Sequence, residues 1–114
     1  MSRYYEMHVD VDVPLGDRAL MDVIFEACAK QWPFTDMDMC DYEDHTNISM
    51  DARGHLTGGS SEQDFVDNIY RSVWAAAGCY LPVTVETTYL ESNPYETYSS
   101  DKAEYETWLA SNRG

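Results

Sequence analysis

Side chains that can bind metal ions or basic groups occupy every second position of the segment YEMHVDVDV, residues 5–13. A β-strand turns successive side chains to opposite faces, so this alternation predicts one apolar face and one polar face. The polar face carries Glu6, His8, Asp10 and Asp12. Carboxylates two residues apart on a strand lie roughly 6.5–7 Å from each other. Such a row can attract divalent cations or a basic protein surface.

Metal binding is the alternative interpretation of this row. His8, Asp10 and Asp12 are the candidate ligands, and oxygen ligands of this kind suit Mg²⁺, Ca²⁺ or Mn²⁺. Ligands two positions apart on a flat strand point in parallel, however, and do not converge on one ion. The acidic segment that begins at Asp36 departs from the EF-hand pattern, because a cysteine takes its fifth position and an aspartate replaces its glycine. We therefore expect no cofactor.

Nucleophilic catalysis has little support in this sequence. It contains three histidines and no Gly-x-Ser-x-Gly stretch. Cys40 and His45 are a conceivable pair that the spacing alone does not favour. Cys28 and Cys79 lie in apolar stretches, which predicts reduced, buried thiols and a cytoplasmic location. We expect no enzymatic activity and no catalytic residue.

The charge balance favours a basic partner. The chain has 21 Asp and Glu against 7 Lys and Arg, which gives a net charge of −14. That charge disfavours contact with nucleic-acid phosphates and with anionic membranes, and it favours a strongly basic protein surface. We therefore expect neither direct nucleic-acid binding nor membrane association. Solubility or adaptation to salt is the other explanation of this composition.

The hydrophobic patterns predict one α+β domain over residues 1–114, with a core over about 4–91. Strands are predicted at 5–13, 35–43, 48–56 and 79–91, with helices from Asp17 to about Trp32 and from Ser60 or Ser61 to Gly78. Residues 92–100 are predicted to be a polar loop, and about 101–111 a short C-terminal helix. The order β-α-β-β-α-β is that of the ferredoxin-like split βαβ fold, a four-stranded antiparallel sheet with both helices on one face. In the rival arrangement, the last helix covers the other face.

Under this plan the uncovered sheet face collects acidic side chains from every strand. Like charges on neighbouring strands repel by a few tenths to about 1 kcal/mol per close pair, so stability alone would not favour them. The predicted partner-binding residues are Glu6, Asp10, Asp12, Asp36, Asp38, Asp51 and Glu86, with Asp41, Glu43 and Asp44 at the rim. Tyr95 and Tyr98 join them as tyrosines beside carboxylates, which suit contacts with arginine. The alternatives are a merely solvated face on a regulatory or dimerisation module, and tyrosines that only attach the last helix.

In size, charge and its acidic rows EMHVDVD and TDMDMCDYED, the chain resembles small phage-encoded inhibitors of host defence, of which anti-CRISPR proteins are the best-known group. The stretch TTYLESNPYET, residues 87–97, also resembles segments of phage and mobile-element proteins. The resemblance implies an inhibitor that acts in the host cytoplasm, and the sequence leaves both a monomer and a homodimer open. It implies a CRISPR effector complex as the partner, bound at its basic nucleic-acid channel by mimicry of nucleic acid.

Overall fold

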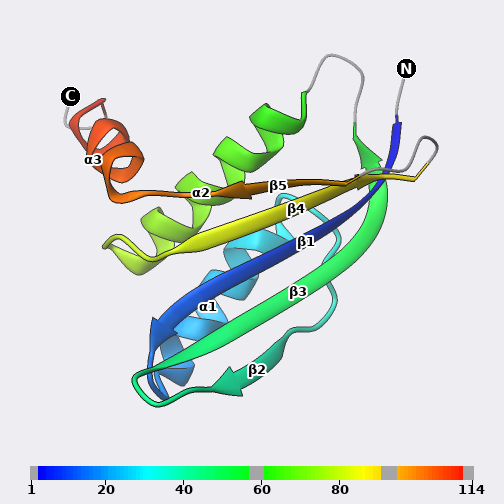
Figure 1. The fold of residues 1–114 in the computed structure, drawn as a ribbon. Helices are drawn as coiled ribbons and strands as arrows, with labels where there is room; N and C mark the ends of the chain where they lie inside the picture. The colour runs from blue at the N-terminus through cyan, green and yellow to red at the C-terminus, as the bar shows by residue number, and fades with distance from the viewer. Residues whose placement is uncertain (1–2, 57–60, 91–94, 112–114) are drawn as a thin grey trace.

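The computed structural model describes residues 3–56, 61–90 and 95–111, which form five strands and three helices (Figure 1). The strands are β1 (Arg3–Pro14), β2 (Asp38–Asp41), β3 (His45–Leu56), β4 (Val83–Tyr89) and β5 (Tyr95–Ser99). The helices are α1 (Arg18–Ala29), α2 (Glu62–Ala77) and α3 (Lys102–Ser111). The predicted mixed α+β fold with one antiparallel sheet is therefore confirmed.

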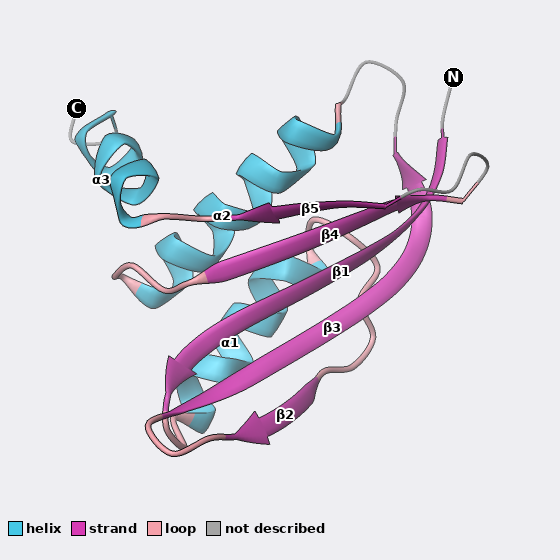
Figure 2. Ribbon diagram, viewed as in Figure 1, coloured by secondary structure: helices cyan, strands magenta, loops and turns pink. Residues whose placement is uncertain are grey.

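The strands lie in the order β2-β3-β1-β4-β5, and each neighbouring pair is antiparallel (Figure 2). The sheet thus has one strand more than predicted, because β5 forms within the segment 92–100 that was expected to be a loop. Tyr98 pairs with Val85 of β4, and its hydroxyl donates to Glu62 at 3.1 Å. These contacts with distant residues hold β5 in the sheet. They could not be predicted from the sequence of the segment itself.

Two boundaries around β2 also differ from the predictions. The strand covers only 38–41 of the predicted 35–43, so Asp36 lies in the irregular segment that precedes it. β3 begins at His45, three residues before the predicted start of the third strand at residue 48. The chain reverses at 42–44, where the Tyr42 amide donates to the His45 carbonyl at 2.8 Å. β2 and β3 thus form an antiparallel hairpin with this short connection.

Reciprocal hydrogen bonds start α2. The Ser61 hydroxyl accepts from the Asp64 amide at 3.1 Å, and the Asp64 carboxylate accepts from the Ser61 amide at 3.0 Å. This capping box satisfies amide groups that would otherwise lack partners in the first turn. Ser60, the other predicted start, lies outside the described residues. Gly78 ends the helix with φ +72°, a left-handed conformation that glycine adopts without a steric penalty.

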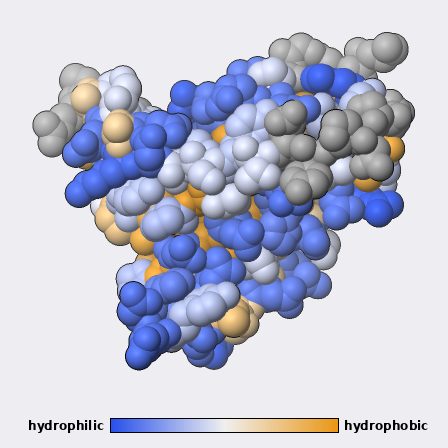
Figure 3. Space-filling model, in the orientation of Figure 1, coloured by the Kyte–Doolittle hydropathy of each residue, from blue (hydrophilic) through white to orange (hydrophobic). Residues whose placement is uncertain are grey.

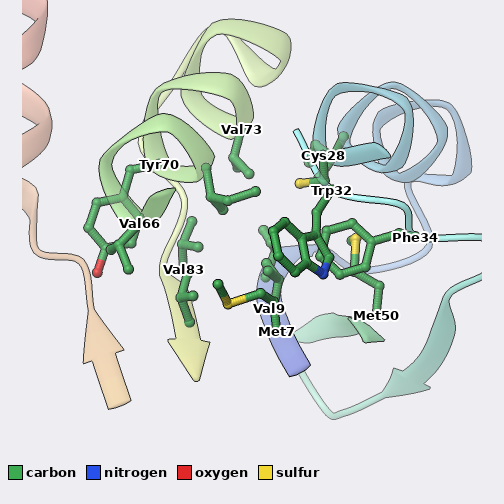
Figure 4. Close-up of a cluster of buried hydrophobic side chains, with 14 of the residues drawn as sticks. Met7, Val9, Cys28, Trp32, Phe34, Met50, Val66, Tyr70, Val73 and Val83 are labelled. Carbon is green, nitrogen blue, oxygen red and sulfur yellow. The ribbon is translucent and has the colours of Figure 1, made fainter. Parts of the chain in front are cut away.

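The core lies between the sheet and the pair α1 and α2, which cover the same face. Met7, Val9 and Val11 of β1 have no exposed surface, and full burial of such a side chain contributes roughly 1.5–3 kcal/mol. Figure 4 shows Met7 and Val9 beside Val83 of β4, with Trp32 close by. The Trp32 indole donates to the Ala52 carbonyl at 2.9 Å, so the segment after α1 is held on β3.

Helix α3 lies beside α2 and leaves the opposite face of the sheet uncovered (Figure 1). The ring centroid of Trp74 in α2 lies 5.4 Å from that of Tyr105 and 5.8 Å from that of Trp108. The rival arrangement, with the last helix over the open sheet face, is therefore wrong. Within the described ranges, each helix is too short or too polar to cross a lipid bilayer.

Candidate functional site

The candidate site is the sheet face turned away from α1 and α2, which we call the open face. Along β1, Val9 is fully buried, whereas the next side chain, Asp10, is 33% exposed. The strand alternation predicted from the sequence is thus confirmed. The open face consists of Glu6, His8, Asp10 and Asp12 of β1, Asp38 and Cys40 of β2, Asn47, Ser49, Asp51 and Arg53 of β3, Thr84, Glu86 and Thr88 of β4, and Thr97 and Ser99 of β5.

The pairing register brings carboxylates from four strands together. His8 lies between Asp51 of β3 and Glu86 of β4 in one row of the sheet. In the next row, Asp10 and Asp38 lie on either side of β3. Each open-face carboxylate is opposed by a residue without a carboxylate, so acids of one row are two strands, or roughly 9.6 Å, apart and repel less than a directly opposed pair would. In Figure 3 most of the visible surface is hydrophilic, and hydrophobic residues show only in small areas.

Local contacts neutralise part of this charge. Arg53 donates from Nε to Glu6 at 3.0 Å, and it is the single Lys or Arg side chain among the open-face residues defined above. The His8 Nε2 atom lies 2.9 Å from an Asp10 oxygen. Exposed pairs of this kind contribute about 0.2–1 kcal/mol each. One arginine therefore leaves the six carboxylates of Glu6, Asp10, Asp12, Asp38, Asp51 and Glu86 largely uncompensated.

An aromatic pair closes one end of the open face. The rings of Tyr42 and His45 stack with centroids 4.9 Å apart. His45 Nε2 lies 3.6 Å from Asp12, and its Nδ1 lies 2.7 Å from Asp44. The hydrogen bond from the imidazole, with its charge, lowers the pKa of Asp44. A hydrogen bond with Cys40, reinforced by nearby negative charge, raises the pKa of Tyr42.

Some predicted partner-binding residues lie elsewhere. Asp41 faces the helix side, where it accepts a hydrogen bond from the buried Thr46 hydroxyl at 2.6 Å. The reason is the strand alternation itself, since Asp41 is one residue out of step with Asp38 and Cys40. Tyr98 also faces the helix side and packs against the core.

The rim residues are arranged as follows. Asp36 is exposed before β2, and Glu43 and Asp44 are exposed in the turn between β2 and β3. Tyr95 pairs with Thr88 at the start of β5, and its side chain lies outside the described part of the structure. Glu43 and Asp44 thus lie in the turn next to His45, which contacts Asp12 at one end of the open face.

The metal alternative gains no support from the geometry. Within the described residues, no three His, Cys, Asp or Glu side chains are grouped in a way that could hold a metal ion. His8 contacts Asp10, but Asp12 accepts instead from Asn47 at 2.9 Å. The parallel direction of side chains along a strand explains why the candidate ligands do not converge.

The surroundings of the cysteines agree only in part with the sequence-based predictions. Cys79 was expected to be buried but is exposed, because it lies in the turn after α2 and not in β4. Cys40 is also exposed, and Cys28 is buried as expected.

The sequence-based predictions did not include Glu62, whose carboxylate accepts hydrogen bonds from hydroxyls of three strands. A glutamate in the first turn of an amphipathic helix gives no sign of such distant partners.

Comparisons with known proteins identify no family. No protein-family model matches the chain, and no curated protein matches its sequence. Among solved structures, the chain is similar to the de novo designed protein Foldit4, with a TM-score of 0.45 and 10% identity over 87% of this chain and 98% of that one. It is also similar to a phage SAM lyase in its apo state, with a TM-score of 0.44 and 15% identity over 85% and 90% of the two chains. Both likenesses are too distant to carry an argument.

Proposed function

We propose that this protein is a non-enzymatic binding protein or inhibitor whose open face occupies a basic, nucleic-acid-binding surface of a partner protein. The observation that supports it is the grouping of six carboxylates from four strands on an uncovered face that has one arginine. A partner rich in lysine and arginine would turn the mutual repulsion of these groups into attraction. It would also be reached faster through electrostatic steering.

The spacing of the carboxylates favours mimicry of nucleic acid. Along β1, Asp10 and Asp12 lie roughly 6.5–7 Å apart, which is similar to the separation of phosphates along an extended strand. Acids of neighbouring strands add further rows beside this one. A groove that binds backbone charge and shape, without reading bases, would accept such a surface.

The resemblance to phage inhibitors of host defence extends this proposal. On that basis the first partner to test is a CRISPR effector complex, whose heteroduplex channel is positively charged. The protein would act in the host cytoplasm, and repulsion between acidic faces would oppose face-to-face dimers.

We also assign the fold to a ferredoxin-like arrangement in which β5 extends the sheet.

The test compares three baits in affinity capture from a bacterial lysate at low salt. One is the wild-type protein, and one carries Asp10→Lys and Asp12→Lys on the open face. The matched control carries Asp22→Lys and Glu26→Lys, which change the net charge equally on exposed positions of α1. Circular dichroism checks that each bait is folded.

We expect the wild type and the α1 variant to retain the same nucleic-acid-binding protein, and the open-face variant to lose it. Added DNA or RNA should release that protein, because the two ligands compete for one basic surface. Retention by the open-face variant, or retention that nucleic acid does not affect, would contradict the proposal.

A further inference from the structure

A second candidate site lies between α2 and α3, away from the sheet. A cavity of about 600 Å³ opens there, and every residue that lines it belongs to α2, to α3 or to the residue just before α3. This volume falls within the range of about 300–1,000 Å³ that is usual for ligand pockets. No residue of the open face contributes to it, so this site is independent of the function proposed above.

Aromatic rings form one side of the cavity and are held in place. Trp74 is 2% exposed, and its indole donates to the Leu81 carbonyl at 3.1 Å. The ring of Tyr70 stacks on it with centroids 5.5 Å apart, and that of Trp108 lies 5.8 Å away at 47°. Fixed aromatic faces attract cations, which prefer positions within about 6 Å of a ring centroid.

Carboxylates gather around this aromatic wall. Asp67, Asp101 and Glu104 line the cavity, and Arg71 is the one Lys or Arg among the lining residues that the structure describes. Burial, followed by the negative charges of Asp101 and Asp67, raises the pKa of Glu104. Burial and the same three carboxylates raise the pKa of Tyr70. The acids are therefore close enough to repel one another, and an added cation would relieve that repulsion.

We propose that this cavity binds the guanidinium group of an arginine side chain presented by a partner polypeptide. A guanidinium is flat enough to stack on the partly buried Trp108 ring, and its N–H groups suit the carboxylates of Glu104 and Asp67. A quaternary ammonium would use the rings but has no donor for the acids. An anion would be repelled by the net negative charge of the lining. The cavity is larger than one arginine side chain, so it can also accommodate the residues that flank the arginine.

The test is a nuclear magnetic resonance titration of the wild-type protein with the capped peptide acetyl-Gly-Arg-Gly-amide. We expect saturable shifts of the Trp74 and Trp108 indole signals, with a dissociation constant of the order of 1 mM. The same peptide with citrulline in place of arginine keeps the shape and loses the charge, and it should produce no saturable shift. Equal responses to both peptides would overturn the proposal.

Matched variants separate recognition from general charge attraction. Glu104→Gln should weaken binding about tenfold, because it removes a charge-assisted hydrogen bond. Glu106→Gln changes the net charge equally at an exposed position of α3 outside the cavity, and should leave binding within about twofold. Equal effects of the two changes would overturn the proposal.

A second cavity variant, on α2, provides the test if Glu104→Gln does not fold. Asp67→Asn should also weaken binding, and unchanged affinity in both cavity variants would count against the site. The open-face variant Asp10→Lys and Asp12→Lys should bind the peptide as the wild type does. If it does not, the peptide binds the open face, and the assignment to the cavity is wrong.

Discussion

Glu62 joins three strands to α2 through one carboxylate. It accepts hydrogen bonds from Tyr5 of β1 at 2.6 Å, Thr87 of β4 at 2.8 Å and Tyr98 of β5 at 3.1 Å. Burial raises the pKa of Glu62, but these hydrogen bonds and the nearby Arg3 charge outweigh it and hold the pKa below its ordinary value of 4.5. Burial and the same hydrogen bond raise the pKa of Tyr5 to about 12. The ionised form of Glu62 is thus part of the folded structure.

Glu62→Gln should lower the free energy of unfolding by about 1–3 kcal/mol at neutral pH, because three hydroxyls lose a charged acceptor. A carboxyl group whose pKa is lowered on folding stabilises the protein above its unfolded pKa, and that stability is lost as the pH falls through the folded value. The difference between wild type and variant should therefore shrink in urea titrations as the pH falls below 4.5, the ordinary pKa of this group. A difference that stays constant between neutral and acid pH would contradict this account.

The three cysteines differ in their surroundings. Cys28 is buried, and burial raises the pKa of its thiol to about 12, whereas Cys40 and Cys79 are exposed. A thiol-specific reagent should therefore label two thiols in the native protein and the third only after unfolding. Cys40→Ser and Cys79→Ser should each remove one native thiol from the count. Rapid labelling of all three would show that the core around Cys28 is not packed as described.

At the scale of elements, the long patterns and the short C-terminal helix could be predicted, whereas β5 could not and the bounds of β2 were predicted too wide. β1 and the two core helices carry enough buried apolar residues to identify their type from the sequence. β5 does not, because Tyr98 is the one side chain of this strand known to pack on the core, and its partners Glu62 and Val85 are remote in the sequence. The same limit applies to the site. The alternation of β1 predicted correctly which of its side chains lie on the open face. For the short strand β2, the prediction placed Asp41 at the rim of that face, whereas its side chain lies on the helix side.

Gly54 marks a close contact between β3 and the segment after α1. A Cβ atom at this position would lie 3.1 and 3.2 Å from two ring carbons of Trp32. The indole is fixed by its hydrogen bond to Ala52, so it cannot easily move away. Gly54→Ala should therefore destabilise the protein by about 1–3 kcal/mol in denaturant titrations.

The control for this steric explanation is the variant Trp32→Phe, which replaces the indole with a smaller ring. In that background the additional effect of Gly54→Ala should fall by more than half. An effect of the same size in both backgrounds would mean that strand backbone, and not the indole, opposes the methyl group.

At the scale of the whole molecule, negative charge acts on stability as well as on binding. A net charge of −14 on one small domain repels itself, and added salt screens that repulsion. The midpoint of thermal unfolding should rise by several degrees as NaCl increases from about 0.02 to 0.5 M. Calorimetric scans check this, and a midpoint that does not change or falls would show that the charges are already compensated within the fold.

The central claim is that the open face binds a basic surface, and the most direct test is the salt dependence of that binding. The measurement is the affinity for the purified captured partner between about 0.1 and 0.3 M NaCl, for the wild type and both charge-reversal variants. We predict that wild-type affinity falls at least about tenfold over this range, and that Asp10→Lys with Asp12→Lys weakens binding more than about tenfold at the lower salt. Asp22→Lys with Glu26→Lys should bind nearly as the wild type does. Equal affinities for the open-face variant and the wild type, or an affinity that salt does not change, would contradict the account.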